Sequence, residues 1–161
     1  MDIWRSNKWE AWIDPSVSLN RSGLRFRIDA GVHPEVRRSC LEFGKWLRKE
    51  YRFPVRVPVY VRNVERLKCR DGDWAYGTFF WTDSFSQEPY IRIAAGDYLK
   101  LLQDWGRECA LTAILKTITH EITHYYQWLN RVSLTDVARE KQASAYSRRI
   151  LNLYATTHDE P

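Results

Sequence analysis

The chain has 161 residues, 44% of them hydrophobic and 28% charged, which favours one globular domain over residues 1–161 and excludes a disordered chain. Its three cysteines, Cys40, Cys69 and Cys109, are widely and irregularly spaced, which argues against a disulfide framework and a cysteine zinc knuckle. The first residues mix acid and base where a signal peptide has an apolar run, and no stretch of about 18 apolar residues occurs. We therefore expect a cytoplasmic protein with no membrane segment.

The net charge of +5 raises the question of a nucleic-acid partner, because Lys and Arg gain affinity by displacing counterions from phosphates. Most basic residues are dispersed along the chain. The densest cluster comprises Arg62, Arg66, Lys68 and Arg70, and acidic residues interrupt it. We interpret this cluster as a solvated basic loop and keep nucleic-acid binding as an alternative.

The first part of the chain alternates apolar and polar residues in a way that predicts β-strands. The predicted strands cover residues 24–29, 55–61, 74–81 and 90–95. Pro58 indicates an edge strand or a bulge, because proline cannot donate a ladder hydrogen bond. A helix with Pro34 in its first turn is expected between the first two strands, ending near Tyr51. Asp71-Gly72-Asp73 is typical of a turn.

From about Asp97 the pattern is helical to the end of the chain. We expect helices over residues 98–105 and 107–129, separated at Gly106, and a last helix over 134–154. Ser133, followed three residues later by Asp136, approximates a capping box for the last helix. This order of elements predicts an α+β fold, in which the helices are segregated from a small sheet.

The segment that carries chemistry is His120-Glu121-Ile122-Thr123-His124. Histidines four apart on a helix lie on one face, one turn apart, and can hold one cation between their imidazoles. Glu121 lies about 100° around the helix from His120, so it flanks the metal without binding it. From that position it can accept a proton from a water that the metal activates, which is the role of a general base.

The rest of this helix predicts how it is oriented. Its apolar residues fall in one sector, centred about 165° from His120 at 100° per residue. They are Leu111, Ile114, Ile118, Ile122, Tyr125 and Leu129. This sector anchors the helix in the core and leaves the histidine face for a ligand.

A catalytic zinc normally has three protein ligands and a water, so a third ligand is required. Glu140 is the favoured candidate, because the small residues that follow it on its helix face, Ala143, Ser144 and Ser147, allow close approach to the histidine helix. Glu140 is alternatively an acid in the first turn of its helix, where the helix dipole stabilises a negative charge. Asp136 could fill that role equally well. Asp136 and, in the tail, His158 remain alternative ligands.

These residues resemble a known family. The run from Thr117 to Tyr126 is similar to the HExxH signature of zincin metallopeptidases, and residues 140–147 resemble the second motif of the ImmA/IrrE-like minimal gluzincins. The resemblance implies zinc on His120, His124 and Glu140, with Glu121 as the base. It also implies a minimal zincin-like fold, in which a helix and a small twisted sheet of three to four strands precede the active-site helix and one helix follows.

Two features depart from related patterns. The metzincin continuation with a glycine and a third histidine is absent, since Gln127 occupies the glycine position. The step from His124 to Glu140 is also shorter than in many gluzincins. The resemblance further implies a substrate-binding edge strand upstream of the active-site helix. We assign this edge strand to residues 90–95. The residues expected to pair with the substrate are Ile91, Arg92, Ile93 and Ala94.

The sequence thus predicts a zinc-dependent metallopeptidase that acts on a peptide or protein. Tyr154, Tyr146 and His158 are candidates for stabilising the oxyanion. One alternative is a zinc-bearing, non-proteolytic module that binds nucleic acid or a protein partner. Another is a latent peptidase whose cleft is covered by tryptophan-rich segments, namely Trp74 to Trp81 and the N-terminal Trp4, Trp9 and Trp12.

Overall fold

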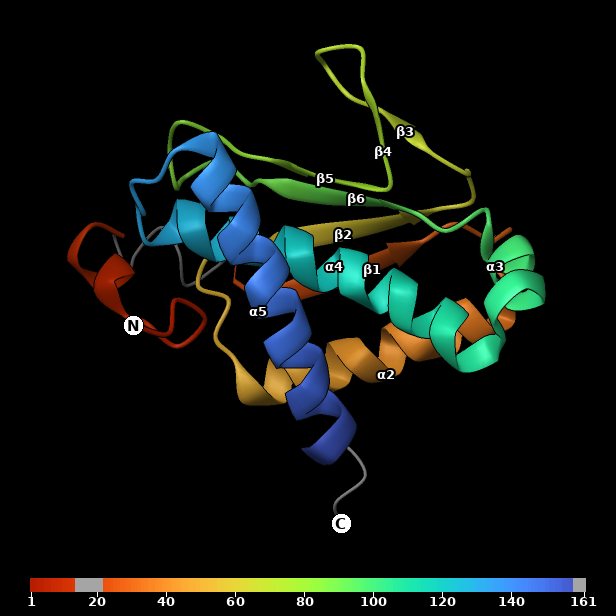
Figure 1. The fold of residues 1–161 in the computed structure, drawn as a ribbon. Coiled ribbons are helices and arrows are strands. Elements are labelled where there is room, and N and C mark those ends of the chain that lie inside the picture. Colours follow the sequence, from red (N-terminus) through yellow and green to blue (C-terminus); the bar gives the residue numbers. More distant parts are fainter. Residues whose placement is uncertain (14–21, 158–161) are drawn as a thin grey trace.

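The computed structural model describes residues 1–13 and 22–157 (Figure 1). Its elements, in chain order, are η1 (Lys8–Ala11), β1 (Leu24–Ile28), α2 (Pro34–Glu50), β2 (Val57–Arg62), β3 (Leu67–Lys68), β4 (Trp74–Ala75), β5 (Gly77–Phe80), β6 (Tyr90–Ala94), α3 (Tyr98–Trp105), α4 (Arg107–Leu129) and α5 (Asp136–Thr157). The predicted α+β class is therefore confirmed. No helix among the described residues is both long and apolar enough to cross a membrane.

A four-stranded sheet in the order β1-β2-β6-β5 forms the frame. β1, β2 and β6 run parallel, and β5 runs antiparallel to β6. One face of the sheet carries fully buried residues such as Val59 and Ile91, and helices α2, α4 and α5 lie on that side (Figure 1). The core lies between this face and the helices, so α4 is held directly against the sheet.

Both alternatives predicted from Pro58, an edge strand or a bulge, are wrong, because β2 lies between β1 and β6 and pairs with β1 in continuous register over residues 57–61. Val57 donates its N–H to the carbonyl of Gly23 beside β1. The backbone nitrogen of the next residue, Pro58, therefore points towards β6, and pairing with β6 begins only at Val59. The N–H that proline lacks would have had no partner there, so an interior strand tolerates it.

The single aromatic strand predicted over residues 74–81 is also wrong. The chain breaks at Tyr76 into β4, which pairs with β3, and β5, which joins the main sheet. The predicted turn is confirmed, since Gly72 has φ +90° and donates its N–H to the carbonyl of Cys69. The basic cluster expected to be a loop thus contributes a strand, β3, to a short hairpin.

Helix boundaries mostly follow the predictions, with one exception. Gly106, at φ +85°, separates α3 from α4 as expected. The last helix begins at Asp136, and the Oγ1 of Thr135 accepts a hydrogen bond from the N–H of Ala138. Thr135 is therefore the capping residue in place of Ser133, because it stands three residues before a free helical N–H.

Two buried tyrosines of α4 fix this helix to the segment that leads into β2. The hydroxyl of Tyr125 donates to the carbonyl of Val55 (2.6 Å) and accepts from its N–H (3.1 Å). The hydroxyl of Tyr126 donates to the carbonyl of Arg52 (2.7 Å). These bonds set the position of α4 along the sheet.

Replacing Tyr125 with Phe should destabilise the protein although it removes no apolar volume. Both backbone groups of Val55 lose their tyrosine partner, and each buried group left unpaired costs about 1–3 kcal/mol. We expect Tyr125→Phe to lower the free energy of unfolding in urea by about 2–6 kcal/mol, and the control Tyr126→Phe, which leaves one carbonyl unpaired, by less. Equal effects would contradict this account.

Candidate metal centre

Helix α4 presents the His-Glu-His segment on the side that its core-facing sector leaves free. The predicted sector is buried, with Ile118, Ile122 and Tyr125 at 0% exposure. His120 and His124 remain partly exposed, and their ring centroids are 4.9 Å apart. Candidate ligand atoms of His120, Glu121 and His124 all lie within 4.8 Å of one another. The predicted orientation of the helix is therefore confirmed.

Glu140, from α5, reaches both histidines. Its Oε2 lies 2.8 Å from Nε2 of His120, and its Oε1 lies 3.0 Å from Nε2 of His124. The two helices approach closely because Ala143 and Ser147, both fully buried, face the contact. The structure thus brings the three residues predicted as metal ligands into direct contact.

Gln127 fixes the orientation of His124. Its Nε2 donates to the carbonyl of Arg139 (3.0 Å) and to Oε1 of Gln142 (2.9 Å), so its own Oε1 must face the histidine. That oxygen lies 2.7 Å from Nδ1 of His124 and accepts its N–H. A neutral imidazole has one donor and one acceptor nitrogen, so the lone pair is left on Nε2.

This arrangement places two acceptors opposite one another. The lone pair of His124 Nε2 faces a carboxylate oxygen of Glu140, which is favourable only with a proton or a metal cation between them. Neighbouring ligand atoms of a tetrahedral zinc lie about 3.3 Å apart, given bonds of about 2.0–2.1 Å. The observed separations of 2.8 and 3.0 Å are within about half an ångström of that value. The residues present therefore fit a small divalent metal.

Glu121 is a buried carboxyl beside these groups. It is 7% exposed, and its pKa is raised to about 8, first by burial and then by the negative charge of Glu140. Gly77 of β5 lies against it, since a Cβ at Gly77 would be 2.7 Å from the Thr117 side chain and 3.0 Å from Glu121 Cγ. Any larger residue there would displace the helix or the carboxyl, so this glycine permits the close approach of β5.

Burial also acts on His124. It lowers the pKa of the imidazole, and the hydrogen bond to Gln127 and the charge of Glu140 oppose part of that effect. The neutral form that burial favours is the form that binds metal ions.

The assignment of residues 90–95 as the edge strand is wrong. β6, with Ile91, Arg92, Ile93 and Ala94, lies between β2 and β5, and β5 is the edge strand next to α4. Ala94 donates its N–H to the carbonyl of Tyr76, so the residues that alternate with Tyr76 direct their backbone groups to the free side. In β5 these are Gly77 and Phe79, and Gly77 is the residue that contacts Glu121.

The two tyrosines predicted to stabilise the oxyanion do not reach the centre. The Tyr146 hydroxyl donates to the carbonyl of Met1 and accepts from the N–H of Ile3, and Tyr154 packs against Phe43 with ring centroids 4.8 Å apart. Tyr154 lies about 21 Å along α5 from Glu140 at 1.5 Å per residue. Both tyrosines serve packing and tethering.

The geometry gives the alternative ligand Asp136 no support. Asp136, at the start of α5, is exposed, and no contact with either histidine is found within residues 22–157. His158 lies outside the described residues. Glu140 is therefore the third ligand candidate that the geometry favours.

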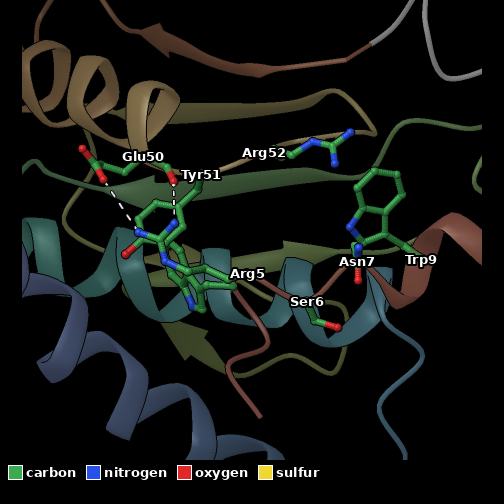
Figure 2. A pocket seen from close by; sticks show the side chains of 8 residues that line it. Arg5, Ser6, Asn7, Trp9, Glu50, Tyr51 and Arg52 are labelled. Atoms are coloured by element: carbon green, nitrogen blue, oxygen red, sulfur yellow. Dashed lines mark hydrogen bonds and ion pairs between the residues drawn. The ribbon is translucent and has the colours of Figure 1, made fainter.

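The N-terminal tryptophans belong to the core and its margin. Trp4 is 2% exposed and Trp9 is 7% exposed, and Trp12 donates to the carbonyl of Leu129. Figure 2 shows the hollow that this segment forms with the end of α2, where Arg5 bonds to Glu50. No candidate metal ligand lines this hollow.

Two residues of the centre were missed from the sequence, although a signal existed for each. Gln127 stands three positions after His124, a spacing that places both on one helix face. Gly77 is a glycine within a strand, which often marks a close backbone approach.

Comparisons with protein-family models, with curated proteins and with solved structures return no match.

The raised pKa of Glu121 predicts a pH dependence of the metal-free protein. Folding raises this pKa from 4.5 to about 8, so the stability linked to it is complete below about pH 4.5 and is lost as the pH rises to about 8. In a chelator, Glu121→Gln should therefore be more stable than the wild type at pH 8, and the difference should shrink towards pH 4.5. Thermal unfolding at a series of pH values measures it. A pH-independent difference would contradict the assigned environment of Glu121.

The role of Gln127 predicts a loss of metal affinity. Gln127→Leu removes the acceptor that orients His124 and should weaken zinc binding about 10- to 100-fold. Gln127→Glu keeps an acceptor opposite Nδ1 and should retain tighter binding than the leucine variant. Competition with a chromophoric chelator gives the affinities, and circular dichroism checks that both variants fold. Unchanged affinity in the leucine variant would remove Gln127 from the centre.

Proposed function

We propose that the protein is a zinc-dependent metallopeptidase with a minimal gluzincin-like fold, in which His120, His124 and Glu140 hold the metal. The observation that carries the proposal is the pair of opposed acceptors, His124 Nε2 and a Glu140 oxygen, 3.0 Å apart. Gln127 fixes the imidazole tautomer, so a cation between these atoms satisfies both. The three ligands and their spacing match a catalytic zinc site, which leaves one position for water.

Zinc bound there would supply a Lewis acid that activates water and polarises a carbonyl. Glu121 provides the proton transfer: its buried carboxyl accepts a proton from the attacking water and delivers it to the leaving amine. Burial that raises the pKa of Glu121 supports this role, because a base with a pKa near the working pH can both accept and release a proton.

The free edge of β5 supports a peptide substrate. An extended peptide can add to an exposed strand edge through main-chain hydrogen bonds. The outward backbone groups of Gly77 and Phe79 offer this edge, and Gly77 lies in contact with Glu121. A peptide paired with these residues passes beside the general base, which places a scissile bond within its reach.

Metal content and turnover test the proposal together. Elemental analysis of purified wild-type protein should give one zinc per chain, Glu140→Ala should hold zinc weakly, and Asp136→Ala should be unaffected. Glu121→Gln should retain zinc and lose about 10²- to 10⁴-fold in the hydrolysis of a mixture of internally quenched peptides.

The matched control is Glu108→Gln, which makes the same change at an exposed position on α4. It should leave zinc content and turnover unchanged. A protein that refuses zinc, or a Glu121→Gln variant with normal turnover, would overturn the proposal.

A further inference from the structure

The face of the sheet opposite the helices, here called the outer face, carries arginines. Side chains alternate across a strand, so the residues between the buried valines and isoleucines point to this face. The arginines are Arg25 and Arg27 on β1, Arg62 on β2 and Arg92 on β6. The four strands contain no Asp or Glu. The outer face is therefore basic.

Aromatic rings lie among these arginines. Phe80 stacks on Tyr90 with centroids 4.8 Å apart, and Tyr60 meets Tyr90 edge-on at 6.1 Å. Tyr60 is 39% exposed. From the β3–β4 hairpin, the guanidinium of Arg70 lies 4.4 Å from the centroid of the Phe80 ring. The centre of the outer face is thus a cluster of partly exposed rings.

The strand register places basic groups on both sides of the exposed ring. Tyr60 pairs with Arg27 on β1 and with Arg92 on β6. Neighbouring strands are about 4.8 Å apart, so the backbones of the two arginines flank that of Tyr60 across the sheet.

Two arginines are available to a partner. Arg25 and Arg27 are exposed and form no ion pair with a residue of the described ranges. Arg62 is paired with Asp29 (3.0 Å), and Arg92 is close to Thr78 Oγ1 (3.4 Å) and the Lys68 carbonyl (3.5 Å). The nearby acids lie outside the strands: Asp29 follows β1 and holds Arg62, Glu88 precedes β6, and Asp71 and Asp73 lie on the hairpin.

The absence of a covering layer distinguishes this face. Parallel strands such as β1, β2 and β6 nearly always have both faces covered. Here the helices lie on one side only, and within the described residues only the hairpin rises on the other (Figure 1). A charged and aromatic surface does not suit an apolar helix as its cover.

We infer that the outer face binds single-stranded nucleic acid. Proteins that bind single strands combine a basic surface for phosphates with aromatic rings on which unpaired bases stack. The outer face supplies Arg25 and Arg27 for phosphates and Tyr60 for a base. A duplex has no free base faces to offer Tyr60, and an anionic lipid surface needs no exposed ring between arginine-bearing strands. This inference is independent of the metal centre.

Fluorescence anisotropy of a short labelled oligothymidine, measured at several salt concentrations, tests it. Wild-type protein should bind with a salt-dependent affinity. The double variant Arg25→Ala with Arg27→Ala should lower the slope of log K against log salt by about 1.4, at about 0.7 per lost phosphate contact. Tyr60→Ala should weaken binding about tenfold at all salt concentrations. A chelator should change nothing.

The matched control removes the same charge elsewhere. Arg38 and Lys45 are exposed on α2, on the other side of the sheet. Arg38→Ala with Lys45→Ala should bind as the wild type does. No binding, equal binding to a duplex of the same length, binding to phosphatidylserine vesicles without binding to the oligonucleotide, or equal loss in the control would each overturn the inference.

Discussion

The contact between the Glu140 carboxylate and the two imidazoles of α4 is the interaction on which the centre depends. It requires α5 to lie almost against α4, and the fully buried Ala143 and Ser147 make that possible. It also requires a defined imidazole tautomer. Gln127 supplies it through a network that itself spans the two helices, because its amide donates to Arg139 and Gln142 of α5. Helix packing and ligand orientation are therefore set by the same residues.

Helix α4 carries both the core and the chemistry, and the two demands oppose one another at Glu121. Apolar burial anchors the helix, yet the same burial penalises a charged carboxyl and raises its pKa to about 8. A divalent cation nearby would favour the charged form again. Gly77 increases the burial of Glu121, because the backbone of β5 takes the space where solvent would otherwise reach the carboxyl. The charged form of Glu121 therefore carries an electrostatic penalty in the metal-free protein, and a bound metal would offset it.

The parts of the structure that the sequence predicted are those that depend on local periodicity. The helix 107–129, its buried sector and the proximity of Glu140 to the histidines follow from residue spacing and side-chain size. The strand order does not, because pairing between distant segments leaves no local mark. The resemblance led to residues 90–95 as the edge strand, yet β5 is the edge. The prediction from Pro58 was wrong for the same reason. The N–H that proline lacks costs a ladder hydrogen bond only where the neighbouring strand already pairs, and β6 begins to pair at Val59.

The sheet combines three environments within four strands, and each follows from the backbone arrangement. Its inner face is apolar because α2 and α4 cover it. Its β5 edge is unpaired within the described residues because the antiparallel strand ends the sheet beside α4, and the proposed function would place an extended peptide there, next to the buried carboxyl. Its outer face carries guanidiniums and rings, and burying unpaired guanidiniums under an apolar layer would cost several kcal/mol each. This cost disfavours an apolar cover for the outer face and is the reason that we propose an anionic, hydrated partner for it. If so, substrate strand and nucleic acid would occupy different surfaces of one small sheet.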